Sequence, residues 1–257
     1  MELNAIAFSY KNGPQIIGDM TAEIEPGKMT TIIGPNGSGK STLLGLMARN
    51  LLPASGSIII DGRDIAAFKP KELARRLAVV HQHNDAPVDL TVERLVEYGR
   101  LPYRSMFAQD SAADQEAIAW ALECTKLTAF RDRKLIELSG GQRQRAWIAM
   151  ALAQRTSILL LDEPTTYLDI FHQIELLDLI RTLNKEHGIT IVMVLHDVNQ
   201  AVRYSDHLKV MKDGKLFAQG TPEEIMDGRL MEEVYGVQAA IRSDDETGLY
   251  IIPLSTI

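Results

Sequence analysis

The sequence predicts an α/β fold with a small antiparallel sheet near the N-terminus and an inserted helical segment. Three observations predict it. The glycine-rich stretch at residues 34–42 stands between a β-prone run, residues 30–33, and apolar residues at helical spacing. Two apolar runs, residues 158–161 and 190–195, have the composition of buried parallel strands, and no strand is needed from about residue 85 to residue 157. A chain of 257 residues with 46% hydrophobic content is sufficient for one such domain.

Charge and composition argue against several classes of protein. The formal net charge is −7 and the pI is about 5.4, without a run of like charge, so neither a nucleic-acid-binding face nor a polybasic membrane surface is expected. Cys124 is the one cysteine and cannot form an internal disulfide. No apolar signal segment follows Met1, and no apolar run approaches the ~20 residues that span a bilayer. We therefore expect a cytoplasmic protein that needs a partner for any role in a membrane.

Residues 34–42, GPNGSGKST, fit the phosphate-loop pattern. A glycine-rich turn that matches by chance is the alternative, but the flanking strand and helix favour the phosphate loop. Its glycines permit backbone angles that let amide N–H groups surround phosphate oxygens. We expect Lys40 to reach the β- and γ-phosphates and Ser41 to offer its hydroxyl to Mg²⁺. The residues expected at the nucleotide are Gly34, Pro35, Asn36, Gly37, Ser38, Gly39, Lys40, Ser41 and Thr42.

The segments on either side of the phosphate loop predict short strands. Alternating residues 3–10 and a run over 16–24 predict two antiparallel strands closed by the Pro26–Gly27 turn. Two interpretations of Tyr10 stay open: it stacks on the adenine ring, or it is a strand aromatic that fills the core. Further elements are expected as a strand over 56–61, a short helix over 70–77 and a strand over 77–80.

The strand over 77–80 ends in three polar residues. We interpret His81 and His83 as ordinary loop histidines rather than metal ligands, because no further ligand cluster lies nearby. Gln82 directly follows an apolar strand, where open α/β sheets place groups that contact ligands. Gln82 is therefore a candidate site residue.

Helices dominate the segment that follows. One is predicted over 91–98, and another begins after a loop over 99–110 at a capping box of Ser111 and Asp114. LSGGQRQR, at residues 138–145, precedes a third helix. By itself this stretch could be an ordinary helix N-terminus that contains glycines. Together with the phosphate loop it predicts a second helix N-terminus that binds an anion. The residues expected there are Ser139, Gly140, Gly141 and Gln142.

Two further strands are followed by ionisable residues that could take part in catalysis or metal binding. The strand over 158–161 is followed by Asp162 and Glu163. Burying a carboxylate at the end of an apolar strand costs free energy unless the carboxylate binds a metal or accepts hydrogen bonds. The strand over 190–195 ends in His196, which either caps the following helix or contacts a ligand. Between them we expect a loop over 165–169 and a helix over 170–183. The remaining elements are a hairpin over 210–217, a helix start at 221–224 and terminal strands over 236–252.

The phosphate loop, Gln82, LSGGQ, LLLDEP, the loop at Asp169 and His196 occur in the order of an ATP-binding-cassette (ABC) ATPase, which the chain resembles over almost its whole length. The resemblance implies a P-loop NTPase (RecA-like) core with an antiparallel β subdomain, formed by residues 1–84 and 158–257, and a helical subdomain over 85–157. GRLPYR at 99–104 and TTYLDIFHQIELLDLI at 165–180 most resemble ATPase subunits of importers for ferric siderophores, haem and vitamin B12. One departure is His81, where the family commonly has proline.

The resemblance also implies the roles of the site residues. Lys40 and the loop amides would hold ATP, and the Mg²⁺ ligands would be Ser41, Gln82 and Asp162. Glu163 would be the general base that orients the attacking water, with Gln82 beside it and His196 reaching the γ-phosphate. The implied catalytic residues are Glu163, His196, Lys40 and Gln82.

Partners follow from the same resemblance. Two copies of the chain would pair head to tail, so that the Ser139–Gln142 stretch of one copy closes on the ATP held by the other. A separate transmembrane permease would be contacted near residues 82–101, at the cytoplasmic face of the membrane, and an extracytoplasmic binding protein would take part indirectly. Iron–siderophore members are the nearest in resemblance, so a ferric siderophore is the expected cargo. Haem, vitamin B12 or another substrate stay open as alternatives, because this subunit would not touch the cargo.

Three rival functions are disfavoured by the sequence. A DNA-repair or chromosome-organising ATPase would carry a long coiled coil, and the chain shows neither sustained heptads nor a basic face. A translation factor of the same family would carry two cassettes. A small-molecule kinase would explain Lys40 but not Ser139.

Overall fold

A computed structural model describes residues 1–11, 13–87, 89–104 and 111–257. The chain divides into two compact units, the first formed by Met1–Ala67 and Val192–Ile257 and the second by Phe68–Ile191. Residues 105–110, half of the loop expected over 99–110, lie outside the described residues. No helix in the described part of the chain is long and apolar enough to cross a membrane.

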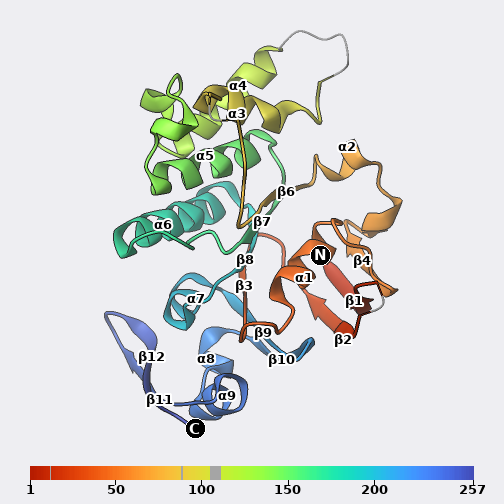
Figure 1. The fold of residues 1–257 in the computed structure, drawn as a ribbon, viewed down its shortest axis with the longest axis vertical. Helices are drawn as coiled ribbons and strands as arrows, with labels where there is room; N and C mark the ends of the chain where they lie inside the picture. The colour runs from red at the N-terminus through yellow and green to blue at the C-terminus, as the bar shows by residue number, and fades with distance from the viewer. Residues whose placement is uncertain (12, 88, 105–110) are drawn as a thin grey trace. The chain divides into compact units, whose positions relative to one another are not determined.

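The first unit begins with the predicted antiparallel sheet, coloured red to orange in Figure 1. Its order is β2-β1-β4-β5, and neighbouring strands are antiparallel. Leu3 and Ile6 of β1 and Ile17 of β2 are fully buried. Leu3 and Ile6 are three positions apart, and a register shift between them lets both face the core. The strands are β1 (Glu2–Ser9), β2 (Gln15–Glu23), β4 (Ser55–Ile60) and β5 (Arg63–Asp64), followed by the short helix η1 (Ile65–Ala67).

The strand before the phosphate loop is the centre of the first unit. All five residues of β3 (Met29–Ile33) are buried, and β3 pairs in parallel with β9 (His207–Lys212). The predicted hairpin joins β9 to β10 (Lys215–Gly220), and α1 (Lys40–Met47) follows the loop. On the other side of β3 lies β8 (Thr190–Val194), where the Leu195 N–H donates to the Ile32 carbonyl at 3.4 Å.

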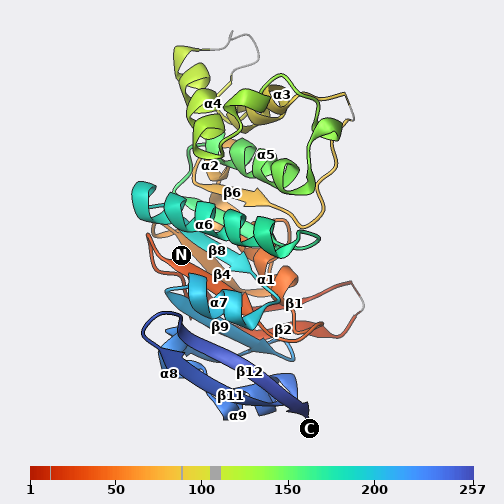
Figure 2. The ribbon, with the colours of Figure 1, turned by 90° about the vertical axis from the view of Figure 1, so that its left-hand side faces the viewer.

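The C-terminal elements of the first unit end in a long hairpin. The terminal strands expected over 236–252 are β11 (Val237–Asp244) and β12 (Gly248–Thr256), so the second strand extends further than expected. Figure 2 shows α7 beside β12, where the Asn199 side chain donates to the Ile251 carbonyl at 3.0 Å and accepts its N–H at 2.7 Å. The preceding helices are α7 (Val198–Tyr204), α8 (Pro222–Ile225), α9 (Gly228–Leu230) and the π-helix η5 (Met231–Tyr235).

Two parallel strands and a long helix organise one part of the second unit. β6 (Leu77–Val80) pairs with β7 (Ile158–Asp162), with Val80 opposite Leu161. α6 (Ile170–His187) is longer than the helix expected over 170–183. On the face of α6 that carries Ile174, Leu177 and Ile180, the last two are buried and Ile174 is 41% exposed.

The helix expected over 70–77 is shorter in the structure. α2 (Pro70–Leu73) ends four residues earlier, and β6 begins at Leu77. Backbone carbonyls of the segment between them accept hydrogen bonds from a side chain outside the helix. The Gln154 side-chain amide donates to the carbonyls of Ala74, at 2.5 Å, and Leu77, at 3.2 Å. Those carbonyls are therefore engaged by a side chain from a distant helix instead of the next helical turn.

The rest of the second unit is helical, as expected for residues 85–157, coloured yellow to green in Figure 1. The described part of that segment contains no strand. The capping box of Ser111 and Asp114 is present, and its helix buries Ile118, Ala121 and Leu122. The main helices are α3 (Val92–Glu97), α4 (Ala112–Cys124) and α5 (Gly140–Ala153), with short turns η2 (Tyr98–Arg100), η3 (Thr128–Phe130) and η4 (Leu135–Glu137).

GRLPYR has a structural role in the second unit. Arg100 and Asp114 form a buried ion pair at 2.7 Å, and Arg100 also donates to the Ala153 carbonyl at 2.6 Å. A Cβ at Gly99 would lie 2.1 Å from the Met150 carbonyl oxygen, so only glycine allows this approach. Burial by itself would raise the pKa of Asp114, but hydrogen bonds from Arg100 and Ser111 lower it below its usual value.

Candidate nucleotide site

The phosphate loop lies in the first unit between β3 and α1, as the sequence predicts. Gly34 has a φ of 149°, and a Cβ there would lie 2.2 Å from the Met211 carbonyl oxygen. Gly39, with a φ of 98°, precedes the helix. Lys40 is buried, and its Nζ donates to the carbonyls of Gly34 at 2.8 Å and Pro35 at 3.0 Å. The Lys40 ammonium is thus held by backbone carbonyls of the phosphate loop itself.

The groups that the loop presents fit a phosphate. Within the described chain, the amides of Asn36, Gly37 and Gly39 donate to no acceptor. The Ser38 hydroxyl is buried without a hydrogen-bond partner among the described residues. The first turn of α1 carries no acidic residue. Free N–H groups and a lysine at a helix N-terminus favour an anion, so the residues present fit a nucleotide phosphate.

Tyr10 stands beside this loop. The side chain is 51% exposed, which contradicts the interpretation of Tyr10 as a core aromatic. Its hydroxyl lies 3.4 Å from the Thr42 hydroxyl, and its ring meets Phe8 edge-on at 4.9 Å between centroids. The aromatic face is therefore available next to the phosphate loop.

Gln82 and Glu163 meet in the second unit. The Gln82 side-chain amide donates to Glu163 Oε2, and the Thr166 hydroxyl donates to the same oxygen at 3.2 Å. Glu163 adopts a φ of 49°, which is uncommon outside glycine and occurs often at functional sites. Asp162, immediately before it, is the last residue of β7 and is partly exposed. Thr166 was not among the predicted residues; its position three residues after Glu163 was the available signal.

The LSGGQ stretch begins α5, also in the second unit. Ser139 caps the helix by accepting the Gln142 N–H at 3.3 Å, and Gln142 accepts the Ser139 N–H at 3.0 Å. A Cβ at Gly141 would lie 2.3 Å from the His172 ring, so glycine is required for the approach of α6. His172 was not predicted from the sequence, because nothing local to Gly141 indicates which side chain packs against it.

The candidate histidines His81, His83 and His196 lie in exposed positions. His196 lies two residues beyond the end of β8, but the cap of α7 is Asp197, which accepts the Gln200 N–H at 2.8 Å. The interpretation of His196 as a helix cap is therefore wrong. His81 and His83 are exposed, and the described residues include no group of three or more His, Cys, Asp or Glu that could hold a metal. Any Mg²⁺ would need hydroxyl, amide or phosphate oxygens in addition to a carboxylate.

The predicted site residues thus fall into two groups. Tyr10, residues 34–42 and His196 belong to the first unit, whereas Gln82, Asp162, Glu163 and the Ser139–Gln142 stretch belong to the second. Within the second unit, the structure joins Gln82 to Glu163 by a hydrogen bond, and Ser139 begins a separate helix.

Comparison with known proteins gives consistent matches. Residues 17–166 match the family model described as ABC transporter. The chain is 49% identical over 246 residues to the petrobactin import ATP-binding protein FpuC of Bacillus anthracis, covering 96% of this chain and 90% of that one. It is 48% identical over 237 residues to the ferric enterobactin transport ATP-binding protein FepC of Escherichia coli (strain K12), covering 92% and 88%. A dimeric ATP-binding cassette solved in a post-hydrolysis state with ADP and Pi has a TM-score of 0.74 and 30% identity, covering 86% of this chain and 98% of that one.

Proposed function

The chain belongs to the ABC transporter family, and we propose that it is the ATP-hydrolysing subunit of an importer that takes up an iron chelate, with a ferric siderophore as the cargo. Two relatives that match over most of both chains support the cargo class, since one is a petrobactin import protein and the other a ferric enterobactin transport protein. The hydrolytic activity is supported by the similar cassette solved with ADP and Pi.

The observation that carries the hydrolytic function is the pair formed by Gln82 and Glu163. Both follow the carboxyl ends of adjacent parallel strands, where α/β proteins place reacting groups. Glu163 accepts a proton from water as that water attacks the γ-phosphate of ATP, and ADP and phosphate are released. Gln82 orients the carboxylate, and His196 contacts the γ-phosphate.

The nucleotide is held by the phosphate loop. Lys40 exchanges the carbonyls of Gly34 and Pro35 for phosphate oxygens, and the loop amides complete the cradle. Tyr10 stacks on the adenine ring. Ser41, Gln82 and Asp162 would hold Mg²⁺, which would supply charge neutralisation at the phosphates. A serine at a helix start, an amide and a carboxylate supply the oxygen ligands that Mg²⁺ prefers.

A second copy of the chain completes the site. The large side chains Tyr167, Ile170 and Phe171 are 84%, 74% and 67% exposed, an unusual concentration of apolar surface at the loop before α6 and its first turn. This surface supports a contact between copies, and the similar cassette was solved as a dimer. The Ser139–Gln142 stretch of one copy then closes on the γ-phosphate bound by the other copy, so that ATP joins the two chains.

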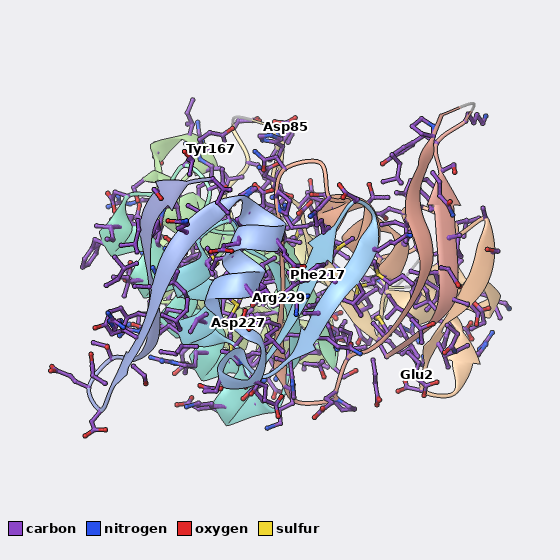
Figure 3. The ribbon with its side chains drawn as sticks, turned by 90° about the horizontal axis from the view of Figure 1, so that it is seen from below. Glu2, Asp85, Tyr167, Phe217, Asp227 and Arg229 are labelled. Atoms are coloured by element: carbon purple, nitrogen blue, oxygen red, sulfur yellow. The ribbon has the colours of Figure 1, made fainter. Side chains whose placement is uncertain are left out.

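The permease docks on the helical segment of residues 85–157, which acts as a subdomain beside a core of residues 1–84 and 158–257. A groove of about 250 Å³ in the second unit supports this location. Ile136, on the groove, is 62% exposed, and Asp85, labelled in Figure 3, lies on the loop after β6. The groove is lined by Asn84, Asp85, Ala86, Pro87, Leu135, Ile136, Arg143 and Trp147. The chain would thus bind the cytoplasmic face of the membrane, and an extracytoplasmic binding protein would deliver the cargo.

Uptake by cells that lack this chain tests the function. We expect cells without it to lose uptake of iron supplied as a ferric siderophore, and a plasmid with the natural sequence to restore it. Glu163→Gln on the same plasmid should fail to restore uptake. Haem and vitamin B12 serve as the comparison substrates, because loss of one of these with normal siderophore uptake would reassign the cargo. Normal uptake of all three would contradict the importer function.

A further inference from the structure

The N-terminus of α5, which carries the Ser139–Gln142 stretch, packs against the first turn of α6 within the second unit (Figure 1). The contact is centred on Gly141 and His172. A Cβ at Gly141 would lie 2.3 Å from Cδ2 of His172, 3.0 Å from its Cγ and 3.3 Å from its Cβ. These are the three nearest atoms, so the imidazole edge of His172 fills the space that a side chain at position 141 would need.

The same two helices are joined again one turn further along. Arg145 of α5 and Glu175 of α6 form an ion pair at 2.8 Å, and the arginine side chain is only 13% exposed. Arg145 stands four residues after Gly141, and Glu175 stands three residues after His172, so each pair of positions shares one helix face. The ion pair holds the body of α5 on α6, and the contact of His172 sets the position of the first turn of α5.

The start of α6 is itself held by hydrogen bonds. The backbone N–H of His172 donates to Asp169 Oδ1 at 3.0 Å, and the ring Nδ1 of His172 lies 3.3 Å from the same oxygen. The next residue, Gln173, donates from its side-chain amide to the Leu168 carbonyl at 2.9 Å. The imidazole therefore approaches Gly141 from a fixed support.

We propose that His172 is a positioning residue for the hydrolytic reaction. By packing against Gly141 it fixes the place of the Ser139–Gln142 stretch, and thereby the affinity of one copy of the chain for the ATP held by the other. This inference rests on the proposed function of that stretch as the part that closes on the nucleotide of the second copy. His172 does not act on the reacting atoms; it holds in position a group that must meet the γ-phosphate with little freedom of movement.

Dimer formation in ATP with Mg²⁺ tests the proposal. Sedimentation measures it in the Glu163→Gln background, where little ATP should be hydrolysed. We expect His172→Ala to raise the dissociation constant of the dimer about tenfold, within the range of coupling between residues in contact. ATP binding to the isolated chain should stay within about twofold, because the phosphate loop belongs to the other unit and lies far from the change.

His187→Ala is the matched control. It removes the histidine that ends the same helix, at the opposite end from His172. That variant should form the dimer as the Glu163→Gln chain does.

Gly141→Ala separates positioning from a direct contact of His172 with the second copy. Alone, the added Cβ meets the imidazole, so we expect a loss of dimer at least as large as that of His172→Ala. When His172 is also alanine, only its Cβ remains of the three nearest atoms, at 3.3 Å. The double variant should therefore form the dimer no more weakly than Gly141→Ala alone.

Three outcomes would overturn the inference: an unchanged dissociation constant of the dimer in His172→Ala, an equal loss in His187→Ala, or losses that add in the double variant. Additive losses would show that His172 acts independently of Gly141. An equal fall in ATP binding by the isolated His172→Ala chain would also contradict a role confined to the Ser139–Gln142 stretch. Failure of the Glu163→Gln chain to form any dimer with ATP would instead contradict the proposed function.

Discussion

The side-chain amide of Gln82 donates a hydrogen bond to the carboxylate of Glu163, although the two residues are 81 positions apart in the sequence. Each stands two residues beyond a paired position of the parallel strands, Val80 on β6 and Leu161 on β7. Because parallel strands in register bring equivalent positions to one edge of a sheet, the pairing places both side chains together. The contact explains how a glutamine from one loop can orient a carboxylate from another.

Glu163→Gln is expected to bind ATP and form the dimer but to hydrolyse ATP at least about 100-fold more slowly, since an amide cannot accept the proton of the attacking water. Steady-state hydrolysis and size measurement in ATP with Mg²⁺ check this. Glu123→Gln, an exposed glutamate of α4, is the control and should behave as the natural chain. Near-normal hydrolysis by Glu163→Gln would remove Glu163 from the role of general base.

Ser139→Ala should leave ATP binding to the isolated chain unchanged, because the proposed contact of Ser139 is with the nucleotide of the second copy. Dimer formation with ATP and hydrolysis should both fall by tenfold or more. Alanine also removes a helix cap, which costs about 1 kcal/mol of stability. Ser111→Ala controls for this, since Ser111 caps α4 in a similar capping box. Equal losses of activity in the two variants would show that the cap, and not a nucleotide contact, explains the result.

Tyr10→Ala is expected to weaken ATP binding at least about fivefold, because stacking of a base on an aromatic side chain contributes about 1–3 kcal/mol. Tyr10→Phe keeps the ring and should bind ATP nearly as the natural chain does. Titration with ATP and with inorganic triphosphate separates the base from the phosphates. The triphosphate should bind both variants equally, and a loss of triphosphate binding in Tyr10→Ala would indicate damage to the loop through Thr42.

Ile136→Asp should reduce co-purification of the permease and the transport it supports, because a carboxylate in the apolar part of the groove opposes burial against a partner. ATP binding by the isolated chain should not change. Leu52→Asp is a matched control, as Leu52 and Ile136 are each 62% exposed and Leu52 does not line the groove. Intact co-purification and transport with Ile136→Asp would place the permease contact elsewhere.

Asp114→Asn is expected to lower the free energy of unfolding at pH 7 by about 3 kcal/mol, because Arg100 would lose the carboxylate of a buried pair. Since the pKa of Asp114 is lowered in the folded state, its contribution is complete above the unfolded pKa of about 3.9 and is lost as the pH falls through the lower folded value. The stability difference between the natural chain and Asp114→Asn should therefore shrink on acidification below about pH 4.

Urea unfolding at several pH values measures this difference. Asp178→Asn alters a pair on α6 whose two side chains are substantially exposed and should change stability by less than about 1 kcal/mol at any of these pH values. A difference for Asp114→Asn that grows on acidification would contradict the assignment of the ion pair as the source of stability.

The sequence predicted well those structural features that depend only on residues close together in the chain. The glycines before Lys40, the capping box at Ser111, the helix start at Ser139 and the apolar runs of β7 and β8 depend on local backbone angles and side-chain period, and each appears where it was expected. The order of these motifs also identified the family.

By itself, then, the sequence determined the phosphate loop, the strand ends that carry Gln82 and Glu163, and the family. Only the tertiary structure decided that α2 stops at Leu73, that Ile174 is exposed and that Asp197 caps α7 in place of His196. The physical reason is that periodicity and caps act over a few residues, whereas burial and long-range hydrogen bonds depend on which segments the fold brings together.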